Sequence, residues 1–248
     1  MLRPGRFQLD SREVCLRTVR LEASQDNFTR CLAWLSPDET ARAERFHFPQ
    51  HRQAFVLGRA VLRALLGSYL GIPAAGVRFV YGPQGKPALE SDACALRFNA
   101  SNSGNLAAYV FTTGCEIGID IEQHRALPDF ENIAHRFFSP DEAAELLGLP
   151  ASEKTAAFFH CWTRKEAYIK AMGGGLAIPL DSFRVTLQPG VAARIVSLGG
   201  SDEAARGWTL DSFDPAPGYA GAVAYPDGLR PIQAGPLVSV DDLLVDCG

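Results

Sequence analysis

Hydrophobic residues recur along the chain at two spacings, every second position and every third or fourth, which predict strands and helices respectively. The first half predicts a strand at 14–21, a helix that starts at the Ser-Pro-Asp-Glu of 36–39, and a long helix from about 50 to 69. Serine is a favoured helix cap and proline suits the first helical position, so this tetrapeptide is a start signal. Further strands are predicted at 77–81, 96–100 and 106–111.

The second half of the chain repeats this order. It predicts a strand at 116–122, a helix that starts at a second Ser-Pro-Asp-Glu at 139–142, and a helix at 158–172 that stops at three glycines. The sequence GNLAAYVF at 104–111 is echoed by GYAGAVAY at 218–225. The two Ser-Pro-Asp-Glu sequences lie 103 residues apart. Similar segments in one order indicate a duplicated unit.

The repeat predicts an α+β fold with two similar, pseudo-symmetric lobes, 1–112 and 113–248, and a cleft between them. Laying Ala60 on Ala167 places Arg59 on Glu166 and Arg63 on Lys170. This alignment assigns anion binding to the first lobe and metal binding to the second.

Glu166 and Lys170 lie four residues apart, so both side chains project from one face of the predicted helix. On spacing alone, such a pair is also an ordinary exposed ion pair. Strand spacing in EIGIDIE places Asp120 and Glu122 on one face, beside Gly118. That face is either solvated or, with Glu166, an oxygen-rich site of the kind that Mg²⁺ prefers.

Two further segments are open to two interpretations. FNASNSGNL at 98–106 is either an ordinary turn or a loop that meets a phosphate through Ser101 and backbone N–H groups. Lys86, in Gly-Lys-Pro at 85–87, is either an exposed turn residue or a nucleotide contact.

Composition narrows the function classes. The chain has 248 residues, 47% of them hydrophobic, and a net charge of −4, which argues against general binding to a nucleic-acid backbone. No apolar run approaches the ~20 residues that cross a bilayer, and the N-terminus lacks an apolar signal-peptide core. We therefore expect a cytoplasmic protein that binds neither nucleic acid nor membrane. The six cysteines show no zinc-like spacing and are expected to be reduced core residues.

IGIDIE, RFFSPDE and WTRKEAYIK with its glycine-rich end occur in an order that resembles the Sfp-type 4′-phosphopantetheinyl transferases, in the branch with the W…KEA form of the motif. The resemblance covers most of the chain. It implies a two-lobed monomer that binds coenzyme A and Mg²⁺ in the cleft. It also implies transfer of the 4′-phosphopantetheine arm to a serine of an apo acyl or peptidyl carrier protein, with release of 3′,5′-ADP. The pathway could be fatty acid, polyketide or nonribosomal peptide synthesis.

By this resemblance, Asp120, Glu122 and Glu166 are the Mg²⁺ ligands, and Asp120, Glu166 and Lys170 carry catalysis. Lys170 would contact the diphosphate, and Glu166 would take the proton of the attacking serine. The other expected contacts to coenzyme A are Arg42, Arg52, Lys86, Pro87, Ser101 and Asn102. An acidic carrier would dock beside the cleft, where Phe137 and Phe138 are candidates unless they belong to the core.

Two departures from the family pattern stand out. Asn102 occupies a position where the family often has histidine, and Glu39 stands where a lysine is expected. Two rival functions therefore remain at this point. One is a Mg²⁺-dependent hydrolase of nucleotide diphosphates. The other is a coenzyme A or carrier-protein binding module without turnover.

Overall fold

The computed structural model describes residues 13–90, 95–226 and 228–245. Its first half runs β1 (Val14–Arg20), α1 (Gln25–Leu32), α2 (Pro37–Glu44), α3 (Pro49–Leu70), β2 (Phe79–Tyr81), β3 (Pro87–Leu89), β4 (Leu96–Ser103) and β5 (Leu106–Thr113). The second half runs β6 (Gly118–Gln123), α4 (Phe130–Phe137), α5 (Pro140–Gly148), α6 (Ala151–Met172), β7 (Phe183–Val185), β8 (Ile195–Leu198), α7 (Asp202–Ala205), β9 (Trp208–Phe213) and β10 (Tyr219–Pro226). β11 (Ile232–Ala234), β12 (Val238–Ser239) and α8 (Val240–Val245) follow.

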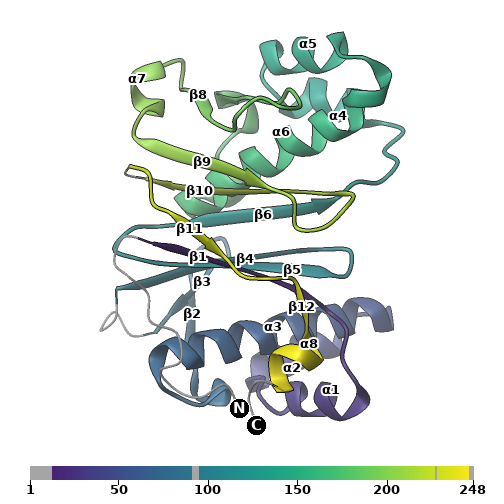
Figure 1. Cartoon of the computed structure of the whole chain (residues 1–248), viewed down its shortest axis with the longest axis vertical. Coiled ribbons are helices and arrows are strands. Elements are labelled where there is room, and N and C mark those ends of the chain that lie inside the picture. The colour runs from purple at the N-terminus through teal and green to yellow at the C-terminus, as the bar shows by residue number, and fades with distance from the viewer. Residues whose placement is uncertain (1–12, 91–94, 227, 246–248) are drawn as a thin grey trace.

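The molecule is built in four layers, with helices outside and two sheets between them (Figure 1). The first sheet has the order β11-β1-β5-β4, with β12 also paired to β1, and the second has the order β6-β10-β9. β1, β5 and β4 are joined as β6, β10 and β9 are, by antiparallel pairing. The mixed fold and its internal repeat are therefore as predicted.

Three apolar cores hold the layers together. One fills the space between the first sheet and α1 to α3, and a second fills the space between the second sheet and α4 to α6. The third lies between the two sheets and includes Ile117, Ile119 and Ile121. Because this middle core is apolar, the two halves are packed together at their centre. Polar side chains meet where β4 lies beside β6.

The repeat is closer in the structure than the sequence alignment suggested. α3 and α6 each have 22 residues and end at left-handed glycines, Gly71 and Gly173, which are 102 residues apart. The alignment of Ala60 with Ala167, an offset of 107, is therefore wrong by five residues. Arg63 corresponds to Lys165, and the first half has Ala64 and Ser68 where the second has Glu166 and Lys170.

The buried glutamates of the two capping boxes explain this correspondence. Glu39 accepts a hydrogen bond from the backbone N of Ser36 and one from Nε of Arg63, at 3.0 and 2.7 Å. Glu142 accepts one from the backbone N of Ser139, at 2.8 Å, and lies 2.8 Å from Nζ of Lys165. A helix cap and a buried ion pair are thus combined in both halves, and Arg63 is a structural residue rather than an anion-binding one.

The last described part of the chain returns to the first sheet. β11 and β12 both pair in parallel with β1, and α8 lies beside α1 (Figure 1). The division into 1–112 and 113–248 stays a prediction. In the structure, however, residues 232–245 pack with the first half, because the outer edge of β1 is open to further strands.

Candidate functional site

The site begins where α6 crosses β6 at Gly118. A Cβ atom at this position would meet the carbonyl oxygen of Ala167 and the amide nitrogen of Ala171, both in the backbone of α6. Only glycine allows this close approach, since backbone atoms of a packed helix have little freedom to move. The contact fixes the height of α6 above β6, and with it the position of the side chains that α6 directs toward the strand.

Alternation along β6 then sends two carboxylates toward α6. Ile119 and Ile121 are completely buried in the core between the sheets, so Asp120 and Glu122 project from the opposite face. Asp120 is only 4% exposed. The solvated-face interpretation of EIGIDIE is therefore wrong for Asp120, because α6 and β4 cover it.

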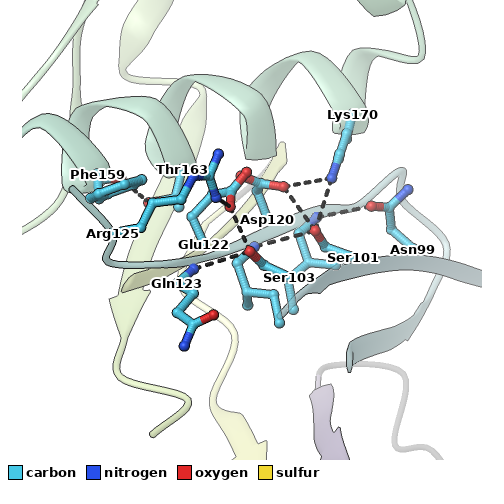
Figure 2. A network of polar contacts seen from close by, with 12 residues as sticks. Asn99, Ser101, Ser103, Asp120, Glu122, Gln123, Arg125, Phe159, Thr163 and Lys170 are labelled. Atoms are coloured by element: carbon cyan, nitrogen blue, oxygen red, sulfur yellow. Dashed lines mark hydrogen bonds and ion pairs between the residues drawn. The ribbon is translucent and has the colours of Figure 1, made fainter. Parts of the chain in front are cut away.

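Asp120 is held by two donors from different elements. Its Oδ1 accepts hydrogen bonds from Nζ of Lys170 at 2.6 Å and from Oγ of Ser101 at 2.8 Å (Figure 2). Nζ of Lys170 also donates to Oγ of Ser101, at 3.1 Å. The second oxygen, Oδ2, is buried and has no hydrogen-bond partner among the described residues. A buried oxygen of this kind is a candidate for a bound cation.

Side chains of β4 bond to the backbone of β6 at every second residue. Oδ1 of Asn99 accepts from the backbone N of Ile119 at 3.1 Å, and Oγ of Ser101 accepts from the backbone N of Ile121 at 3.3 Å. Oγ of Ser103 accepts from the backbone N of Gln123 at 3.1 Å (Figure 2). The three side chains replace a neighbouring strand, so FNASNS is part of a strand rather than a turn.

Glu122 is less enclosed than Asp120. Its Oε2 accepts a hydrogen bond from Oγ of Ser103 at 2.6 Å and lies 3.4 Å from Nη1 of the exposed Arg125 (Figure 2). The side chain of Glu122 is 24% exposed, which leaves this carboxylate open to a ligand on one side.

The charges of the other two carboxylates affect the pKa of Glu166. Burial raises the pKa of Glu166, negative charge on Asp120 and, to a smaller extent, on Glu122 raises this pKa further, and Lys170 lowers it. Negative charge on Asp120 and Glu122 thus acts on Glu166, and this repulsion favours a cation nearby.

The metal prediction itself is not confirmed. Among the described residues there is no group of three or more His, Cys, Asp or Glu side chains already arranged to hold a metal ion. The ammonium group of Lys170 instead lies against Asp120. The donor set nevertheless fits Mg²⁺, because it offers carboxylate oxygens, one of them buried and unpartnered.

Two cavities adjoin this cluster and share Pro87, Asn99 and Ala100 in their walls. One, of about 290 Å³, is also lined by Lys86, Glu166 and Lys170, with others from α6 and the 84–85 turn. The other, of about 170 Å³, lies between α3 and β4 and is lined by residues that include Phe55, Arg59, Ser101 and Asn102. Of the predicted residues, Lys86, Glu166 and Lys170 thus line the larger cavity, Ser101 and Asn102 line the smaller one, and Pro87 lines both.

Lys86 connects the two halves of the chain beside the larger cavity. Its Nζ lies 2.9 Å from Oε2 of Glu116 and donates to the carbonyl oxygen of Ala171 at 3.4 Å. Lys86 is thus half-buried rather than an exposed turn residue, because it bonds to Glu116, just before β6, and to the end of α6.

The predicted arginine contacts lie further from the carboxylates. The guanidinium of Arg42 is exposed and lies over the ring of Phe55, which lines the smaller cavity. Arg52 packs over Phe28 of α1 and is not among the residues that line either cavity. Arg42 is likewise absent from the lining of both cavities, so the roles of both arginines as coenzyme A contacts stay predictions.

Of the two phenylalanines considered for docking, Phe138 is a core residue. It is 2% exposed and its ring lies 5.4 Å from that of Phe158, whereas Phe137 is 37% exposed. Sequence reasoning also missed Asn99 and Ser103, although their alternation with Ser101 was a period-two signal.

The remaining expectations concern cysteines and membranes. Cys15, Cys31, Cys115 and Cys161 are buried free thiols, as predicted, and Cys94 and Cys247 lie outside the described residues. Within the described ranges, no helix combines the length and the apolar composition needed to cross a membrane.

Comparisons with known proteins agree with this arrangement. Residues 116–224 match the family model described as the 4′-phosphopantetheinyl transferase superfamily, and residues 20–113 match the one described as 4′-phosphopantetheinyl transferase, N-terminal. The 4′-phosphopantetheinyl transferase HetI of Nostoc sp. is 40% identical over 225 residues, which cover 90% of this chain and 91% of HetI. The 4′-phosphopantetheinyl transferase Sfp of Bacillus subtilis is 34% identical over 224 residues, 89% of this chain and 95% of Sfp.

Proposed function

The chain belongs to the 4′-phosphopantetheinyl transferase superfamily, and from that premise we propose how its residues carry out the transfer. It is an enzyme that moves a phosphopantetheine arm from coenzyme A to carrier proteins. We propose that the serine hydroxyl of an apo acyl or peptidyl carrier attacks the phosphorus next to pantetheine. The P–O bond to the nucleotide breaks, and 3′,5′-ADP leaves with the electron pair.

The observation that carries this proposal is the ion pair of Lys170 with the buried Asp120, beside a cavity that Glu166 and Lys170 line together. Phosphoryl transfer needs little covalent help and much stabilisation of charge, which these groups supply in opposite signs. Asp120, Glu122 and Glu166 would hold Mg²⁺, which when bound supplies positive charge to the diphosphate.

Lys170 is placed to stabilise the leaving group. Two of its three N–H donors are used by Asp120 and Ser101, and the side chain lines the larger cavity. The third donor would bond to an oxygen of the diphosphate. Since Asp120 fixes the ammonium group, little side-chain entropy remains to be lost when the phosphate binds.

Glu166 is the proposed acceptor of the serine proton, directly or through a water molecule. Burial and the charge of Asp120 raise the pKa of Glu166 in the metal-free protein, and a bound cation would lower this pKa again, so the proposed role as base rests on the position of Glu166. Its place in the wall of the larger cavity gives it access to a substrate hydroxyl.

The nucleotide end of coenzyme A is proposed to lie in the smaller cavity. Pro87, Ser101 and Asn102 line this cavity, and Arg42 lies over Phe55 at its side. Asn102 is exposed and can donate a neutral hydrogen bond to a phosphate, in place of the charged histidine of many relatives. Lys86 and Pro87 would bound the path between the nucleotide and the diphosphate.

A small acidic carrier is the proposed partner, with Phe137 as the exposed apolar contact. The monomeric state, the cytoplasmic location and the lack of nucleic-acid and membrane partners stay predictions. The rival functions receive no support, since the relatives that match most of the chain are named transferases.

The test is transfer itself. The protein is incubated with coenzyme A, MgCl₂ and a panel of apo acyl and peptidyl carriers, and carrier masses are measured intact. We expect a gain of one phosphopantetheine group, lost in EDTA and in a carrier whose acceptor serine is alanine. Phosphopantetheine released to water without any carrier would instead indicate a hydrolase. Tight coenzyme A binding without transfer to any carrier would indicate a binding module.

A further inference from the structure

Ser101 and Ser103 make the same pair of hydrogen bonds, two residues apart. Oγ of Ser101 donates to Asp120 and accepts from the backbone N of Ile121. Oγ of Ser103 donates to Glu122 and accepts from the backbone N of Gln123. In both cases the hydroxyl bonds to a carboxylate and to the amide that follows it (Figure 2).

This geometry leaves the hydroxyl of Ser103 with little choice of orientation. Ser103 is 8% exposed, and its oxygen accepts from Gln123, so its single hydrogen is directed to Oε2 of Glu122 at 2.6 Å. A hydrogen bond to a carboxylate is stronger than one between neutral groups. The second contact to the same oxygen, from Arg125, is longer and lies on an exposed side chain.

The third β4 side chain that bonds to the backbone of β6 shows that hydroxyls occur opposite carboxylates. Asn99 accepts from the backbone N of Ile119, but the residue before Ile119 is Gly118, which has no side chain. Where β6 has no carboxylate, β4 has the amide of Asn99. Where β6 has a carboxylate, β4 has the hydroxyl of Ser101 or Ser103. β4 thus presents a hydroxyl only where β6 presents an acid.

We propose that Ser103 is a positioning residue for the transfer reaction, and that it acts by holding the carboxylate of Glu122 toward Asp120 and Glu166. This inference rests on the proposed function. Of the two carboxylates on β6, Glu122 is more exposed than Asp120 and has the longer side chain. The orientation of Glu122 therefore depends more on a hydrogen bond from a neighbouring residue. Without the hydroxyl, the carboxylate would swing toward Arg125 and solvent.

Four variants test the proposal. Ser103→Ala removes the hydroxyl, and Ser103→Thr keeps it. Arg125→Gln removes the other contact to the same oxygen of Glu122. Ser239→Ala is the control for loss of a hydroxyl, because Oγ of Ser239 also donates to a carboxylate, Asp242, and accepts a backbone N–H, far from the site.

We expect Ser103→Ala to lower kcat about 10- to 100-fold, the range found when a residue that orients a ligating side chain is removed. The Mg²⁺ concentration for half-maximal rate should rise, and the rise in thermal midpoint on adding Mg²⁺ without coenzyme A should shrink. The KM for the carrier should change less than threefold. Ser103→Thr, Arg125→Gln and Ser239→Ala should each keep kcat within about threefold.

A double-mutant cycle separates positioning from folding. In a Glu122→Gln background, Ser103→Ala should have little further effect on kcat, because the carboxylate that it positions is gone. Ser103→Ala with wild-type kcat, or with an equal loss in both backgrounds, would overturn the inference. Failure of the wild-type protein to modify any carrier would instead count against the proposed function, so the two failures are distinguishable.

Discussion

Nζ of Lys165 lies 2.8 Å from Oε2 of Glu142, and both side chains are completely buried. The ammonium group also donates to the carbonyl oxygens of Leu180 and Phe183, at 2.7 and 2.6 Å. Lys165 therefore ties α6 to the cap of α5, to Leu180 and to the first residue of β7. It directly precedes Glu166, so the same contacts hold the helix that carries the proposed base.

Replacing Lys165 should destabilise the protein strongly. Lys165→Met leaves a buried carboxylate and two carbonyl oxygens without their shared donor, and we expect a loss of roughly 3–5 kcal/mol in the free energy of unfolding, measured in urea. Arg206→Met breaks an exposed ion pair with Glu203 and should cost no more than about 0.5 kcal/mol. Equal losses in the two variants would show that the Lys165 pair is not a structural centre.

Gly118→Ala should separate α6 from β6. The added methyl group meets backbone atoms of Ala167 and Ala171, so α6 must move and carry Glu166 and Lys170 with it. Since displacement of reacting groups by about 1 Å costs about 10²-fold, turnover should fall at least that far. Gly148→Ala is the matched control, because nothing lies within 4 Å of its new Cβ atom at the end of α5. Wild-type turnover in Gly118→Ala would contradict the close packing.

Glu166→Gln should trade activity for stability. The folded-state pKa of Glu166 is raised by burial first and by Asp120 and Glu122 second, so ionisation of Glu166 favours the unfolded state. This penalty is absent below the unfolded-state pKa of about 4.3 and complete above the folded-state pKa. Without metal, the variant should therefore unfold at a higher temperature than wild type at pH 7.5.

The thermal midpoint of Glu166→Gln is to be measured from pH 7.5 to pH 4 in EDTA, and turnover at saturating Mg²⁺. The gain in midpoint should vanish as the pH approaches 4, and turnover should fall about 10²- to 10⁴-fold, the usual contribution of a general base. Near-normal turnover would remove Glu166 from the role of base, whatever the outcome for stability.

The sequence was sufficient for much of the fold and for the acidic centre, because both rest on local periodicity. Alternation in EIGIDIE placed Asp120 on the face opposite the isoleucines, and four-residue spacing placed Glu166 beside Lys170. It failed where a contact depends on distant segments. Glu142 was predicted only as part of a helix start signal, yet its partner, Lys165, lies 23 residues further along the chain.

The same limit explains why FNASNS could be interpreted as a turn and why the pairing of β11 and β12 with β1 was not predicted. A run of small polar residues by itself predicts a turn. Asn99, Ser101 and Ser103 instead bond to β6, and the sequence did not predict that β6 would lie beside them. Residues 232–239 pair with β1, more than 200 residues earlier, and no local period marks that return.

Stability should fall in mild acid because of His160. Its pKa is lowered by burial first, then by Arg164 and His124, while Asp214 acts in the opposite direction. Its ring lies near that of His124, which stacks on Phe159, and Nδ1 of His160 has no hydrogen-bond partner among the described residues. The unfolded chain therefore takes up a proton at a higher pH than the folded one, so stability is lost as the pH falls below about 6.5 toward the folded-state pKa.

The free energy of unfolding is to be measured in urea between pH 7.5 and pH 5. His160→Gln removes the imidazole that lies edge-on to His124 and should make the decline shallower. His124 continues to contribute in the same direction, because burial lowers its pKa as well. His47→Gln, at an exposed position, should keep the wild-type pH dependence. If the free energy of unfolding falls equally with pH in His160→Gln and His47→Gln, then His160 does not control stability in acid. The repulsion between Arg164 and a protonated His160 would then be relieved by local rearrangement.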